Sequence, residues 1–167
     1  MAQVQNPLLQ KLQQATEAKV PEQLKGAYKG IIAAGEKVMY SPQSHKMMMQ
    51  QMSQGDPADA AGEGIAKLLA ILLHEMKGAL NMKAAIPAMT HLLCDALDFM
   101  EQAGKCKVDN DLLATAVKEM GSSILQILGA TPDKMQGMMA KGKTMQKPEV
   151  TVPSQEPAGL INQAQGA

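Results

Sequence analysis

Apolar residues recur every three or four positions along most of the chain, which is the period of an amphipathic α-helix. No stretch shows the alternation of β-branched or aromatic residues with polar ones that is typical of a β-strand. Proline and glycine interrupt the helical pattern at intervals of ordinary helix length. We therefore predict an all-α fold, a single helical bundle of about six to seven helices.

Helix start signals divide the chain into these pieces. Ser41-Pro42 and Thr131-Pro132 each combine a capping side chain with a residue that lacks the amide a helix start leaves unpaired. Pro21 is placed to open a helix, and Asp109 is placed to cap one. The expected helices cover about residues 7–19, 21–40, 42–53, 58–77, 85–103 and 109–128, with a short seventh from 132.

The helix expected at 58–77 is the candidate for the centre of the core. Ile71 and Leu73 widen its apolar stripe to most of its circumference, and a helix that is apolar all round is usually buried. The stripe itself consists of Ile65, Leu68, Leu69, Leu72 and Met76.

The chain changes character from about residue 142. Pro148, Pro153 and Pro157 are spread among Gln, Gly and Ala, with few apolar residues. Such a segment buries too little apolar surface to offset the entropy lost on ordering. We therefore divide the chain into a helical bundle domain at 1–141 and an extended or disordered C-terminal tail at 142–167, which a partner could order.

The amino-acid composition limits the classes of partner that the chain is expected to bind. The chain has 15 Met against one Phe, two Tyr and no Trp, and Met side chains adapt to irregular surfaces. The basic residues, all Lys, balance the 16 acidic ones. Without a basic excess or stacking aromatics, nucleic acid contact is not expected as a main function. The longest apolar run, at 65–73 and interrupted by Lys67, is far shorter than the roughly 20 residues of a membrane span, so no stable span is expected.

The most chemistry-like pattern is His91-x-x-Cys94-Asp95-x-x-Asp98. On a helix these residues fall near one face, and each type can bind a metal ion. No second Cys or His pair completes a set of ligands, and a Cys among leucines usually behaves as a small apolar residue. We favour a structural role and expect no metal site. Cys94 and Cys106 are too few for a disulfide framework, and the sequence leaves a bridge between them open.

Two patterns share features with hydrolase sites. His74-Glu75 matches the start of the zinc-protease motif, but Gly78 stands where the second His belongs. Cys94 with His74 or His91 supplies the residue types of a thiol protease, without an orienting group or a glycine-rich oxyanion loop. Phosphate-loop, dinucleotide and EF-hand motifs are missing as well. We therefore expect a protein that is not an enzyme and has no catalytic residue and no cofactor.

A methionine cluster, Met47–Met49 with Met52, follows His45. Thioethers bind Cu(I), but three successive residues on a helix point in different directions. Such a helix is more often core or an adaptable interface. The alternative function is a small zinc- or copper-binding helical protein that uses His91, Cys94, Asp95 and the Met47–Met52 cluster.

Small residues line one face of the helix expected at 21–40. Gly26 and Gly30 are four residues apart, and Ala33, Ala34 and Gly35 follow. Such a face lets two backbones approach closely. The helix also carries charges, so we favour protein–protein packing there over membrane insertion and leave insertion open only after a large rearrangement. The charged residues are Lys25, Lys29, Glu36 and Lys37.

The segment at 26–41, GAYKGIIAAGEKVMYS, resembles small virion structural proteins of tailed bacteriophages. In those proteins a Tyr-containing helix ends in a Lys-Val-Met-aromatic-Ser run, here Lys37–Ser41, before a polar helix with a His-x-Met motif, here His45–Met47. The later plan is also similar: an Ala/Leu-rich helix, a helix that ends in an acidic segment, here Phe99–Glu101, and an Asp-capped helix. The resemblance covers about residues 20–140 and carries over no catalytic residue.

This resemblance implies a multi-copy virion component, made in the host cytoplasm and incorporated into the particle. Such a protein would act at the head–tail connector or among the internal proteins that are ejected with the genome. Its partners would be portal, connector or internal virion proteins and further copies of itself. The contacts would be made by helix packing and by the C-terminal tail.

Overall fold

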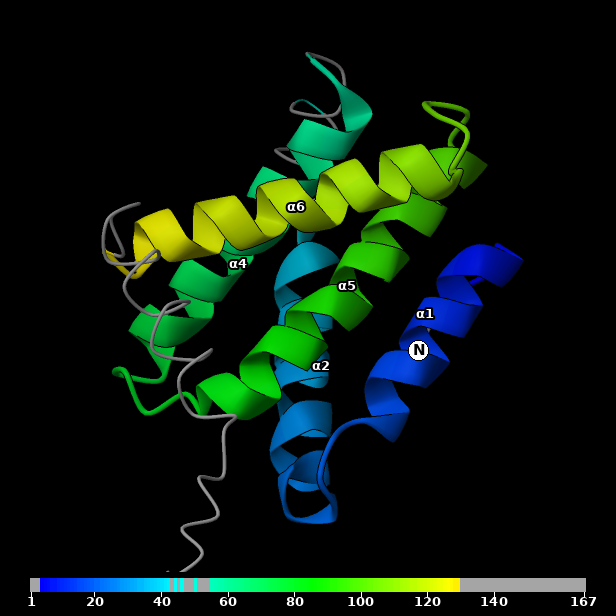
Figure 1. The fold of residues 1–167 in the computed structure, drawn as a ribbon. Helices are drawn as coiled ribbons and strands as arrows, with labels where there is room; N and C mark the ends of the chain where they lie inside the picture. Colours follow the sequence, from blue (N-terminus) through cyan, green and yellow to red (C-terminus); the bar gives the residue numbers. More distant parts are fainter. Residues whose placement is uncertain (1–3, 43, 45, 47–49, 51–54, 130–167) are drawn as a thin grey trace, which may run out of the picture. The chain divides into compact units, whose positions relative to one another are not determined.

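The computed structural model describes residues 4–42, 44, 46, 50 and 55–129 (Figure 1). The chain separates into two compact units, Met1–Thr131 and Pro132–Ala167, and the described residues all belong to the first. The expected helix from 132, the boundary at 141 and the tail at 142–167 therefore lie outside the described residues.

The first unit is all-α, and its described residues contain no strand. They form five α-helices and one short 3₁₀ helix, fewer than the six to seven helices expected. Pro42, Ser44, Lys46 and Gln50 are helical, but the remainder of the helix expected at 42–53 lies outside the described residues. The elements are α1 (Pro7–Ala18), η1 (Glu22–Leu24), α2 (Lys25–Met39), α4 (Pro57–Glu75), α5 (Met82–Gln102) and α6 (Asn110–Ile127).

The second expected helix is divided in two, which corrects the prediction that Pro21 opens it. The amide of Leu24 donates to the carbonyl of Pro21 over 2.8 Å, a spacing of three residues that forms the 3₁₀ turn η1. The α-helix α2 begins only at Lys25. Proline tolerates this tighter turn because its missing amide lies ahead of the hydrogen-bonded residues.

Polar side chains cap four of the α-helices. Asp109 accepts from the amide of Leu112 over 2.9 Å at the start of α6, which confirms the predicted cap. Ser41 likewise accepts from the amide of Ser44 over 3.3 Å. Three caps were not predicted: Asn6 on α1, Asp56 on α4 and Asn81 on α5. Because Asn81 is a cap, α5 begins at Met82 and not at residue 85.

Helix α5, and not α4, is the centre of the core. It packs against α1, α2, α4 and α6 (Figure 1), and twelve of its residues are buried, against eight in α4. Ile71 of α4 and Met76, the residue that follows α4, were both expected in the core, and each is 43% exposed. The prediction was wrong because α4 turns one side to solvent, on which Ile71 follows Glu63 and Lys67 at helical spacing.

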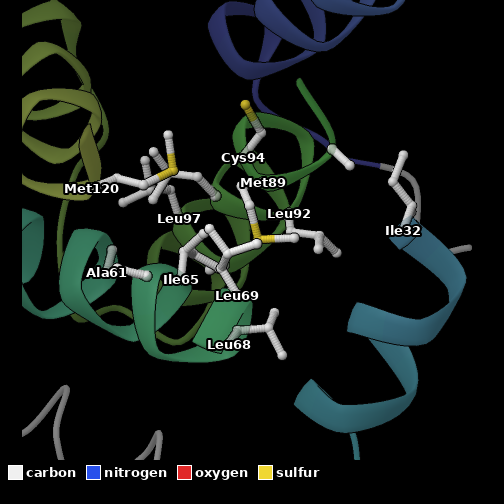
Figure 2. Packing of buried hydrophobic residues seen from close by; sticks show 14 of the residues in the cluster. Ile32, Ala61, Ile65, Leu68, Leu69, Met89, Leu92, Cys94, Leu97 and Met120 are labelled. Carbon is white, nitrogen blue, oxygen red and sulfur yellow. The ribbon is translucent and has the colours of Figure 1, made fainter. Parts of the chain in front are cut away.

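Leucine, isoleucine, methionine and alanine fill most of the core, and Tyr28 is the one fully buried aromatic side chain among the described residues. Figure 2 shows Ile65 and Leu69 of α4, Leu97 of α5 and Met120 of α6 gathered in one cluster. Alanines of α5 are fully buried and let neighbouring helices lie close to it; these are Ala84, Ala85 and Ala88.

Helices α4 and α6 approach closely at Gly62. A Cβ atom at Gly62 would lie 2.8 Å from the carbonyl oxygen of Ala116 and 2.8 Å from the amide nitrogen of Met120. Both atoms belong to the backbone of α6, so no side-chain movement can make room. Glycine at this position is therefore required by the packing of the two helices.

We predict that Gly62→Ala lowers the free energy of unfolding by about 1–3 kcal/mol because the two helices must separate. Gly64→Ala is the matched control, since nothing lies within 4 Å of a Cβ there. It should raise the free energy of unfolding by up to about 1 kcal/mol through better helix propensity. Urea unfolding followed by circular dichroism measures both variants. Equal effects at the two positions would show that the close approach at Gly62 is not a constraint.

Candidate functional site

The polar side of α5 is the one place in the described core where charged groups are buried. Asp95 and Asp98 are 6% and 5% exposed, and His91 lies one turn before Asp95. Successive positions three or four residues apart lie on one face of a helix, so His91, Asp95 and Asp98 form a stripe. Glu101 continues this stripe toward the end of α5. We call these four residues the α5 polar stripe.

Asp98 binds the chain that leads into α1. Its Oδ1 atom accepts from the main-chain amides of Gln5 over 2.8 Å and Asn6 over 2.9 Å. Its Oδ2 atom accepts from the side chain of Gln102. A carboxylate that accepts several N–H groups is compensated for its burial by charge-assisted hydrogen bonds. Asp98 therefore fixes the N-terminal segment on α5.

Asn6 and Glu101 extend this attachment to the α5–α6 connection. The Oδ1 atom of Asn6 caps α1 by accepting from the amide of Leu8 over 2.9 Å. Its Nδ2 atom donates to Oε2 of Glu101 over 2.7 Å. The other oxygen of Glu101 accepts from the amide of Val108 over 2.9 Å. Asn6 and Glu101 together join the start of α1 to the segment that follows α5.

The other end of the α5 polar stripe contacts α1 and α2. The Nε2 atom of Gln13 donates to Oδ1 of Asp95 over 2.7 Å and to the carbonyl of His91 over 3.3 Å. The hydroxyl of Tyr28 lies 3.0 Å from Nδ1 of His91, and the two rings meet edge to face at 84°. Nε2 of His91 lies 3.9 Å from Oδ2 of Asp95. One buried network thus connects α1, α2 and α5.

Burial governs the protonation of this network. It lowers the pKa of His91, against the opposing effect of Glu17 and Glu36, and so favours the neutral imidazole. A proton on Nε2, facing Asp95, leaves Nδ1 free to accept from Tyr28. Burial also raises the pKa of Tyr28 to about 12, which keeps its hydroxyl available as a donor.

Asp95 is a carboxyl group held in an unfavourable environment for its charge. Burial raises its pKa from 3.8 to about 6, and the hydrogen bond from Gln13 opposes that shift. Glu36 and Asp98 raise the pKa further because they are like charges. Glu36 belongs to α2, so the surroundings of Asp95 are acidic on two helices.

Cys94 is a buried thiol and not a reactive one. Its side chain is fully buried, and burial raises its pKa to about 12, so the nucleophilic thiolate is not populated at neutral pH. Burial also raises the pKa of Cys106. Both cysteines are free thiols in the structure.

The residues expected as candidate metal ligands are close together but do not form a ligand set. Within the described ranges, no group of three or more His, Cys, Asp or Glu side chains could hold a metal ion. The oxygens of Asp98 and Oδ1 of Asp95 accept hydrogen bonds within the protein, and Cys94 carries its proton. His45 and the Met47–Met49 and Met52 cluster lie outside the described residues.

The candidate enzyme pairs are not formed in the described part of the chain. His74 and Glu75 are exposed at the end of α4, and Gly78 follows in a left-handed conformation with φ of 77°. Cys94 is fully buried, so exposed His74 does not activate it. His91 uses Nδ1 toward Tyr28 and Nε2 toward Asp95, so neither ring nitrogen serves Cys94.

Four residues of the network were missed by the sequence analysis as functional partners: Asn6, Gln13, Tyr28 and Glu101. Asn6-Pro7 carries a recognisable helix-start signal, a capping side chain followed by proline. The others give no such signal, because their partners lie 63 to 95 positions away along the chain. The pairing depends on how the helices cross.

No protein-family model, curated protein or solved structure matches this chain. No helix in the described portion is long and apolar enough to cross a membrane. The arguments for function therefore come from the residues and contacts themselves.

We predict that Asn6→Asp lowers the free energy of unfolding at pH 7 by about 2 kcal/mol, since it places a carboxylate against Glu101 and Asp98. Asp caps helices as well as Asn does, so loss of the cap cannot cause this effect. The matched control is Asn81→Asp at the exposed cap of α5, where a change of a few tenths of a kcal/mol is expected. Urea unfolding at pH 7 decides between them. Equal small losses at both caps would contradict the anchoring role of Asn6.

We predict that Asp95→Asn raises the free energy of unfolding at pH 7.5 by roughly 2 kcal/mol and has little effect near pH 4. The folded chain binds the proton of Asp95 more tightly than the unfolded chain, so this carboxyl costs stability as pH rises from about 4 to about 6. The lowered pKa of His91 acts in the opposite direction and is present in both proteins. Asp59→Asn, an exposed position on α4, should show no comparable pH dependence. A gain for Asp95→Asn that is the same at both pH values would refute the burial argument.

Proposed function

We propose that this chain is a non-enzymatic structural and interaction protein that assembles with further copies of itself. A solvent-facing line of small residues on α2 carries this proposal. Gly26, Gly30, Ala33, Lys37 and Tyr40 are all exposed, and they alternate in steps of four and three residues. Steps of this kind keep the positions on one side of a helix and are the spacing of a two-helix contact. Gly26, Gly30 and Ala33 are the small residues of this line, and Tyr40 is the cap that follows α2. We call the five residues the α2 small-residue face.

No contact with the described residues requires glycine at Gly26 or Gly30. Nothing lies within 4 Å of a Cβ built at Gly26 or Gly30, and neither residue has a positive φ. A glycine inside a helix costs about 1 kcal/mol relative to alanine. Gly35 differs, since an added Cβ there would collide with the side chain of Leu92. Glycine at these two positions lowers helix stability without a packing contact that requires it. Such a local inconsistency is expected where a residue serves binding to another molecule.

A second copy is the partner that fits this face best. Small residues allow two helix backbones to approach closely, and the contact is repeated identically across a two-fold axis. The chain has no net charge, so repulsion between copies is weak. Tyr40, 46% exposed at the end of the face, adds an aromatic group of the kind enriched at interfaces.

The buried chemistry is consistent with a function that needs no reaction. Asp98 and Asp95 accept hydrogen bonds from the N-terminal segment and α1, and the ring of His91 contacts the Tyr28 hydroxyl of α2. These contacts hold α1 and α2 in place. A catalytic group must reach a substrate, whereas Asp95 and Asp98 are nearly inaccessible. This use of the α5 polar stripe supports a structural role.

The more specific form of the proposal is a multi-copy component of a tailed-phage virion, at the head–tail connector or among internal proteins. The resemblance of residues 26–41 and of the later helix plan supports this form. In this form the protein is made in the host cytoplasm and joins portal, connector or internal proteins. Helix packing and the tail at 142–167 would make the contacts.

We predict that Gly30→Leu weakens self-association at least tenfold while leaving the free energy of unfolding of the single chain unchanged or higher. Leucine prevents close approach on the α2 small-residue face, yet it forms helices better than glycine by several tenths of a kcal/mol. Size-exclusion chromatography with light scattering over a range of concentrations measures the association. Gly64→Leu on α4, where an added Cβ also meets nothing within 4 Å, should leave association intact. A Gly30→Leu protein that associates like the wild type would overturn the proposed contact.

A further inference from the structure

Helix α1 is held differently from the other helices of the first unit. It packs against α5 and makes only slight contact with any other element. Leu9 is its one fully buried residue, whereas α4 has eight buried residues and α5 has twelve. Apolar burial is the main favourable term in helix packing, so α1 receives much less of it than the core helices do.

Leu8 and Leu12 are partly buried against the core, and hydrogen bonds to α5 add to this limited apolar contact. The side chain of Gln13 donates a hydrogen bond to Asp95. The main-chain amides of Gln5 and Asn6 donate to Asp98. The side chain of Asn6 donates to Glu101. Water can replace each of these bonds when the helix leaves, so each contributes a modest net stabilisation. The hydrogen bonds therefore fix the position of α1 along α5. Their total contribution to stability is small compared with the apolar packing of the core helices.

We infer that α1 is a strap that detaches from α5 as one unit while α2, α4, α5 and α6 stay folded. The strap has 12 residues, which is too short for a stable helix in water by itself, so it loses its helical structure on release. Release uncovers Asp95 and Asp98, the carboxylates to which it was bound. Local opening of weakly attached elements below the cost of global unfolding is a general property of folded chains. The inference does not depend on the proposed self-association.

Cys94 reports on this release. It lies four residues before Asp98 and three after His91, so it shares their side of α5. Figure 2 shows its thiol directed away from the Leu and Met cluster, toward the dark blue ribbon of the N-terminal residues. Its side chain is fully buried, so a thiol reagent reaches Cys94 only after an opening. In the opened state its pKa returns toward the ordinary value, and the thiol reacts.

The test uses the full-length chain with Cys106→Ser, so that Cys94 is the one cysteine that reacts. Iodoacetamide labelling is followed by mass spectrometry as a function of urea concentration. We expect labelling without urea at least 100-fold faster than the rate set by global unfolding, with a weak dependence on low urea, because little surface is exposed. Labelling with the full urea dependence of global unfolding would overturn the strap.

Two pairs of variants in this background sharpen the result. Gln13→Ala should raise the labelling rate of Cys94 about tenfold, whereas Gln14→Ala, at an exposed position on the same helix, should leave it unchanged. Gly62→Ala destabilises the α4–α6 contact and so raises the population of the globally unfolded chain. If the strap opens by itself, Gly62→Ala leaves the labelling rate without urea unchanged. A rate that rises in proportion to the loss of global stability in Gly62→Ala would overturn the inference.

Discussion

The carboxylate of Asp98 is buried where the N-terminal segment meets α5, and it accepts hydrogen bonds from two main-chain amides there. A charge in such a place is tolerated only when several donors compensate for the lost water. These two amide donors come from a segment more than 90 residues away in the sequence, so their compensation exists only in the folded chain. The position of α1, the cap at Asn6 and the bond to Glu101 all follow from this arrangement.

The same arrangement explains why the most reactive-looking residues of the chain are structural. Helical spacing brings His91, Cys94 and Asp95 together, as a binding site would require. The ring nitrogens of His91 and the carboxyl group of Asp95 face Gln13, Tyr28 and each other, and the side chain of Cys94 is fully buried. The exposed small residues that would serve binding lie instead on α2, where they leave the helix backbone accessible.

Helical periodicity and capping residues predicted the all-α class and the approximate positions of the described helices. Asp109 was found as a cap because its signal is local, and the same signal was present at Asn6 but was not used. The centre of the core was misplaced, because Ile71 is as apolar as the residues beside it and only the contacts of α5 show which side faces solvent. Pairings such as Gln13 with Asp95 depend on how the helices cross, which local sequence does not specify.

The central claim is that the α5 polar stripe serves to position α1 and α2 within the fold and that the protein acts by binding other chains. Native mass spectrometry of the full-length chain, with and without equimolar zinc, tests it most directly. The account predicts a defined oligomer whose mass is the same in both samples. A monomer that takes up one zinc per chain, and loses it when His91→Ala and Cys94→Ala are combined, would contradict the account and establish the α5 polar stripe as a metal site.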